Sequence, residues 1–131
     1  MSFARTFYQS TARHAVQPAP DPHQIVLVTL QELTRALDVL ATAEGQGRPL
    51  PAEPLNRALT ALYILQSSLD FDAGGAIAID LFQLYEFARF HLLKAWRGED
   101  GARLREAHDV IANILSAWGE IAPGNNEAVP A

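Results

Sequence analysis

Apolar side chains recur every three or four residues in two long stretches of this chain, and this spacing constrains the fold more than any other feature. The first stretch carries Val26, Leu30, Leu33, Leu37 and Leu40. The last stretch repeats the rhythm at Leu104, Ala107, Ile111, Ile114, Trp118 and Ile121. Side chains with this spacing share one face of an α-helix and bury it against other helices. The spacing therefore predicts helices that pack together in a bundle.

Proline and glycine divide the chain into four such helices. Asp21 is a good N-cap residue, Pro22 suits a first helical position, and paired glycines at 74 and 75 favour a turn over a helix. We expect the helices at about 22–44, 53 to 69–71, 76–96 and 104–121. Four helices with short connections pack most economically as an antiparallel up-and-down bundle, so the predicted fold class is all-α.

The 131 residues, of which 49% are hydrophobic, suffice for one domain with a sizeable core. We expect the four-helix bundle at 21–122, a mobile N-terminal arm at 1–20 and a frayed tail at 123–131. The arm ends in a proline-rich stretch and carries three aromatic side chains, Phe3, Phe7 and Tyr8.

Composition excludes several classes of function. Cysteine is absent, which removes disulfides, thiolate nucleophiles and Cys-ligated zinc. The formal net charge of -5 argues against binding to a nucleic-acid backbone. No apolar run approaches the roughly 18 residues that predict a membrane span, and none near the start has the length of a signal peptide. We therefore expect no nucleic-acid partner, no membrane insertion and a cytoplasmic location.

Polar residues form no recognisable catalytic or metal-binding constellation. The histidines His14, His23, His91 and His108 lack the spacing of a helical metal site, so they are expected at the surface or at an interface. Asp70 and Asp72 flank a helix joint, where such residues usually act as caps. Phosphate-binding and nucleophile motifs are missing. We expect no enzyme activity, no cofactor and no metal.

One chemical alternative rests on His91 and Lys94. A histidine with a cation one turn away in a bundle helix resembles the H-x-x-K segment of histidine phosphotransfer domains, which are also four-helix bundles. A charge-assisted hydrogen bond from the lysine would hold a phosphoryl group there. The glycine that usually follows the lysine is Ala95 in this chain.

The helix expected at 76–96 has more apolar side chains than one face holds. Its predicted core face consists of Ile77, Leu81, Leu84, Ala88, Leu92 and Ala95. A second apolar group falls outside that face, at Ile79, Phe82, Phe87, Phe90 and Leu93. Three interpretations remain open: the helix is central or covered by the arm, the second group forms a groove for a chain of another protein, or it serves self-association.

The order and spacing of several motifs resemble the family of flagellar secretion chaperones, FliS. The family signature S-L-D-x-x-x-G-G-x-I-A-x-N-L-x-x-L-Y-x-Y is similar to the segment 68–87, and its closing A-W-x-x-I is similar to 117–121. Pro22 stands where the first long helix of the family begins, and Tyr8 lies upstream at a similar spacing. The chain departs from the family at 29–32, at Asp80, at His91, where family members often have arginine, and at Trp96. The departure at His91 weakens the phosphotransfer alternative, because the family position that aligns with His91 is often arginine.

This resemblance implies a cytoplasmic export chaperone. Such a protein binds the disordered C-terminal region of flagellin, prevents premature polymerisation and presents the subunit to the flagellar type III export gate. A co-chaperone or regulator is a further partner that the resemblance leaves open, as is a homodimer. The arm residue implied in client handling is Tyr8, and we expect the client groove at Phe82, Tyr85, Phe87, Phe90 and Leu93.

Overall fold

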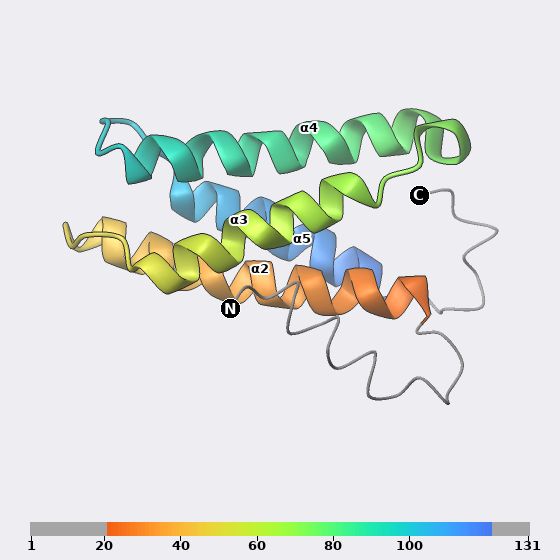
Figure 1. Cartoon of the computed structure of the whole chain (residues 1–131), viewed down its shortest axis with the longest axis horizontal. Helices are drawn as coiled ribbons and strands as arrows, with labels where there is room; N and C mark the ends of the chain where they lie inside the picture. Colours follow the sequence, from red (N-terminus) through yellow and green to blue (C-terminus); the bar gives the residue numbers. More distant parts are fainter. Residues whose placement is uncertain (1–20, 122–131) are drawn as a thin grey trace.

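The computed structural model describes residues 21–121, which form four helices joined by short connections. The helices are α2 (Pro22–Gly45), α3 (Ala52–Ser67), α4 (Phe71–Trp96) and α5 (Leu104–Gly119). Successive helices run in opposite directions, and α5 returns to lie beside α2 (Figure 1). The prediction of an all-α up-and-down bundle is confirmed. The predicted arm at 1–20 and the predicted tail at 123–131 lie outside the described residues.

Helix α2 supplies more of the large buried side chains of the core than any other helix. Its fully buried leucines have the spacing that the sequence showed, and leucines of α3 together with Leu104 and Ile111 of α5 complete the centre. α2 packs extensively against both α3 and α5, whereas α4 packs mainly against α5 and touches α3 more sparingly. In Figure 1, α3 runs obliquely from beside α2 to the start of α4. α4 is therefore covered less by the other helices than α2 is.

The two ends of the described chain are joined by a pair of aromatic side chains. The ring of His23, in the first turn of α2, stacks on the indole of Trp118 in α5 with ring centroids 5.1 Å apart. Nε2 of His23 donates to the carbonyl oxygen of Trp118 at 3.1 Å, and Nε1 of Trp118 donates to the carbonyl oxygen of His23 at 3.0 Å. His23 is buried between α2 and α5 and not exposed at the surface, and its position in the first turn after the cap favours a structural role. It holds the start of α2 to the end of α5.

The connection between α3 and α4 explains why the predicted end of α3 is wrong. α3 ends at Ser67, earlier than the predicted 69–71, and Asp70 then caps α4 by accepting from the backbone N–H groups of Asp72 and Ala73, both at 3.0 Å. The prediction that Asp70 is a cap is confirmed. Gly75 interrupts α4 with φ 52° and ψ -126°, a conformation open to glycine and strained for other residues. The uninterrupted part of α4 therefore begins at residue 76, as the paired glycines predicted.

Candidate functional site

Helix α4 exposes most of its large apolar side chains. Its buried residues are Gly74, Ala78, Tyr85, Ala88, His91 and Leu92. Seven of the nine large hydrophobic side chains that are exposed within residues 21–121 belong to α4: Phe71, Ile77, Ile79, Phe82, Leu84, Phe90 and Trp96. A concentration of this kind on one helix is typical of a surface that binds another chain.

The structure corrects which face of α4 meets the core. Tyr85 was expected in the client groove, but its exposed fraction is 2% and it belongs to the core. Burial raises the pKa of Tyr85 to about 12. Ile77 and Leu84 were expected in the core, but they are 45% and 37% exposed. Both predictions are wrong because the true core face is rotated away from the predicted one.

A regular signal for the true face was present in the sequence. Residues 78, 81, 85, 88, 92 and 95 alternate in steps of three and four, and all of them are buried or half-buried. The predicted set contained two consecutive steps of four. Because α4 has apolar side chains in nearly every direction, the prediction took Ile77 in place of Ala78 and Leu84 in place of Tyr85.

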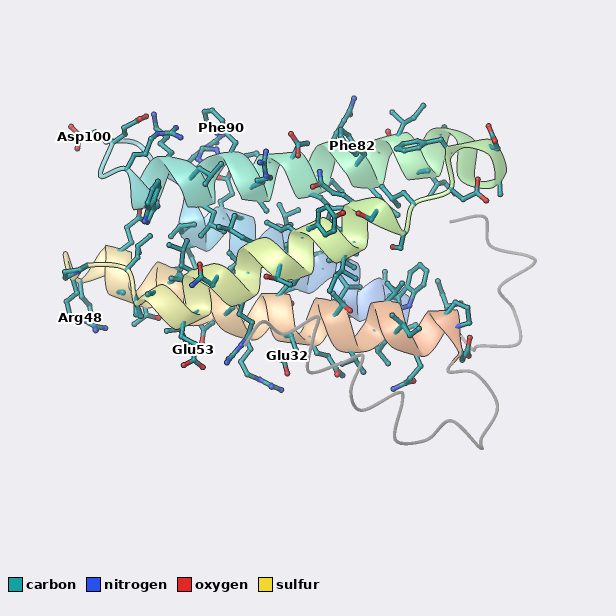
Figure 2. All side chains as sticks on the ribbon, in the orientation of Figure 1. Glu32, Arg48, Glu53, Phe82, Phe90 and Asp100 are labelled. Atoms are coloured by element: carbon teal, nitrogen blue, oxygen red, sulfur yellow. The ribbon has the colours of Figure 1, made fainter. Side chains whose placement is uncertain are left out.

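One part of the exposed apolar surface is a strip along α4 that consists of Phe71, Ile79, Phe82 and Phe90, which we call the aromatic strip. The rings of Phe71 and Phe82 meet edge to face with centroids 6.0 Å apart. Phe82 is 39% exposed and Phe90 is 55% exposed. Figure 2 shows both on α4, whereas charged side chains such as Glu32 and Glu53 lie on the opposite side of the bundle. Two of the predicted groove residues thus lie on one exposed surface.

The other predicted residues lie elsewhere. Phe87 is half-buried on the side of α4 that faces α5. The centroids of the Phe87 and His91 rings are 4.6 Å apart, and the guanidinium carbon of Arg103 lies 5.2 Å from the centroid of the Phe87 ring. Leu93 is half-buried. Tyr8 lies outside the described residues.

A shallow surface groove of about 420 Å³ lies between α4 and α5. Its lining consists of Asp80, Gln83, Leu84, Phe87, Glu106 and Val110, and we call it the α4–α5 groove. Sequence reasoning missed Leu84 and Val110 as surface residues. The signal that could have found Leu84 is the three-four rhythm of the buried set, which leaves residue 84 out.

His91 has a structural role. Its Nδ1 accepts the backbone N–H of Arg103 at 3.1 Å. Burial, together with the nearby charge of Arg103, lowers the pKa of His91. The side chain is only 5% exposed, whereas a phosphoryl acceptor must reach the active site of its donor. The expectation of a surface position is wrong for His91, and the geometry does not favour the phosphotransfer alternative.

Residues 21–121 show neither a metal site nor a membrane-spanning helix. They contain no group of three or more His, Cys, Asp or Glu side chains placed to hold a metal ion. No helix in this part of the chain combines the length and hydropathy needed to cross a membrane.

These features define a class of protein, a four-helix bundle with an unpaired apolar helix surface suited to binding another chain. Comparison with known proteins is more specific. A family profile described as Flagellar protein FliS matches residues 4–125. The chain belongs to the FliS family of flagellar secretion chaperones, and a chaperone family is not an enzyme class.

Individual relatives cover most of the chain. The flagellar secretion chaperone FliS of Vibrio cholerae is 32% identical over 117 residues, which is 88% of this chain and 86% of the relative. FliS of Salmonella typhimurium is 29% identical over 121 residues, covering 91% and 89%. FliSB of Pseudomonas aeruginosa is 25% identical over 115 residues, covering 87% and 91%. No solved structure matches significantly.

Proposed function

We propose that this protein binds the C-terminal segment of flagellin in the cytoplasm, keeps it from polymerising and delivers it to the flagellar type III export gate. Membership of the FliS family supports a flagellar client, and the family resemblance implies which part of flagellin it is. The observation that carries the proposal is the concentration of exposed phenylalanine, isoleucine and leucine side chains on α4.

Physical chemistry explains why a client of this kind fits such a surface. The ends of a filament subunit are apolar and must bury that surface in the filament, so they aggregate when free in solution. A chaperone therefore has to offer a long apolar surface on which a disordered segment can order itself as it binds. The aromatic strip provides three large rings along one helix, which anchor a chain with little loss of side-chain freedom.

The arm belongs to the same proposal. Tyr8, with Phe3 and Phe7, would compete with the client for the apolar surface of α4, because a tethered segment has a high effective concentration. A longer client would displace it. Tyr8→Ala should therefore change the affinity for the client or the efficiency of export.

The test is capture of the purified flagellin C-terminal segment by the full chain in a one-to-one complex, measured by sedimentation. Replacing Phe82 and Phe90 together by alanine should weaken binding at least tenfold. Glu53→Ala is the matched control, because Glu53 is exposed on the opposite side of the bundle and its ion pair with Arg57 is a surface pair. Equal affinity in the double variant and the control would rule out the aromatic strip. Export of flagellin in cells carrying the same variants tests delivery to the gate.

A further inference from the structure

The α4–α5 groove is separate from the aromatic strip. Leu84 follows Phe82 by two residues, and two residues on an α-helix lie about 200° apart around its axis. Leu84 lines the groove towards α5, together with Val110 of α5 and the ring of Phe87. A chain bound on the aromatic strip would therefore leave this groove open for a second segment to bind.

The apolar floor is long enough for a short helix. Ile77 precedes Leu84 by seven residues, so the two lie on the same side of α4, and both are exposed. From Ile77, just outside the groove lining, to Phe87 the apolar side chains on this side of α4 extend over ten residues, or about 15 Å along the helix. A groove between two antiparallel helices accepts a third helix by the same ridge-and-groove packing that builds a bundle. Three turns of a helix match this length.

The rim of the groove is acidic. Asp80 and Glu106 are the charged residues of its lining. Within residues 21–121, Asp80 forms no ion pair. Glu106 pairs with Arg103 at 2.9 Å, but both side chains are more than half exposed, so the pair contributes little and is easily exchanged. Arg103 itself lies over the ring of Phe87 and closes one end of the floor.

We propose that the α4–α5 groove binds an amphipathic helix of the client segment that carries a basic side chain beside its apolar face. Apolar side chains at positions i, i+4 and i+7 of that helix lie on Ile77, Leu84 and Val110. A lysine or arginine on its flank pairs with Asp80. This inference rests on the proposed function and assigns a second binding surface and its chemistry to the same client.

The lack of cysteine in the chain makes a direct test possible. In the full chain, Leu84→Cys places one thiol in the groove, and Ser116→Cys places one on α5 at an exposed position that does not line it. The rate of alkylation by a maleimide is measured for each variant with and without a saturating amount of the flagellin C-terminal segment. The client should slow the reaction at residue 84 at least tenfold and change the rate at residue 116 by less than twofold. Equal rates with and without client at residue 84 would overturn the inference.

Charge is tested by a second pair of variants that keep both side chains nearly isosteric. Asp80→Asn should raise the Kd for the client two- to fivefold and reduce its dependence on salt concentration. Asp100→Asn removes the same charge from the connection between α4 and α5, away from the groove, and should leave both quantities unchanged. The same Kd and salt dependence in the two variants would contradict the basic partner side chain.

The outcomes separate this inference from the function on which it rests. If the wild-type chain does not bind the client, both fail. If the client binds but residue 84 stays reactive, only the groove assignment fails. Slow alkylation at residue 84 relative to residue 116 in the absence of client would also overturn it. If that protection did not depend on protein concentration, residues 1–20 would be the occupant. If it increased with protein concentration, the occupant would be a second copy of the chain.

Discussion

Tyr85 and Phe82 lie one turn apart on α4, and the structure predicts opposite consequences of truncating them. Tyr85 is 2% exposed and packs in the core, whereas Phe82 is 39% exposed and its neighbour Phe71 is exposed as well. Removing a buried aromatic ring leaves a cavity and costs about 3–5 kcal/mol. Removing a partly exposed ring costs only the lost burial, about 1–2 kcal/mol. Tyr85→Ala should therefore destabilise the fold much more than Phe82→Ala.

Urea denaturation followed by helical circular dichroism measures the difference. With an m-value of about 2 kcal/mol per molar urea, Tyr85→Ala should lower the midpoint by about 2 M and Phe82→Ala by less than about 1 M. If Tyr85→Ala does not fold, Tyr85→Leu retains more volume and should still lower the midpoint more than Phe82→Ala.

Client affinity should show the reverse order. Under conditions where each variant is folded, Phe82→Ala should weaken binding and the Tyr85 variant should bind like wild type. Equal midpoints for the two variants, or a loss of affinity confined to the Tyr85 variant, would refute the assignment of Tyr85 to the core and Phe82 to the binding surface.

Three further predictions concern stability. Burial lowers the pKa of His91 below its ordinary 6.5, so the unfolded chain binds more protons at this side chain than the folded chain does. The free energy of unfolding should therefore fall as the pH falls from 7.5 through 6.5. His91→Asn should flatten this dependence in denaturation curves measured across that range. Gly75→Ala should cost about 1–3 kcal/mol because of the positive φ, whereas Gly45→Ala, which has helical geometry and no atom within 4 Å of the added carbon, should be neutral or stabilising in thermal unfolding. Trp118→Phe removes the hydrogen bond to the carbonyl of His23 and should cost about 1 kcal/mol from that bond, with a further loss from the smaller ring; an unchanged melting temperature would contradict this role.

The fold could be predicted because it depends on local signals. The leucines of α2 are spaced to form one seam, Pro22 and Asp21 mark its start, and the glycines at 74 and 75 mark the break before the long part of α4. Each of these signals lies within a few residues of the feature that it controls. The end of α3 was misplaced because Leu69 continued the apolar spacing beyond the helix but packs against the core from the connection, and α4 begins at Phe71, before the glycines that were predicted to precede it.

The candidate site could be predicted only in part, because it depends on which neighbours cover α4. Helical spacing fixes the angle between Phe82 and Tyr85 but not which of the two meets the other helices. His91 is buried because the start of α5 brings the N–H of Arg103 to it, and His23 is buried because Trp118 lies against it. The second contact joins residues 95 positions apart, which no local pattern reveals.

Calorimetric titration of the full chain with the C-terminal segment of the flagellin from the same cell tests the central claim most directly. Measured at several temperatures, it should give one-to-one binding at micromolar affinity or tighter with a large negative heat-capacity change, the signature of a disordered segment that buries apolar surface as it orders. Absence of binding at every temperature, confirmed by sedimentation, would contradict the claim that the exposed surface of α4 is a flagellin-binding site.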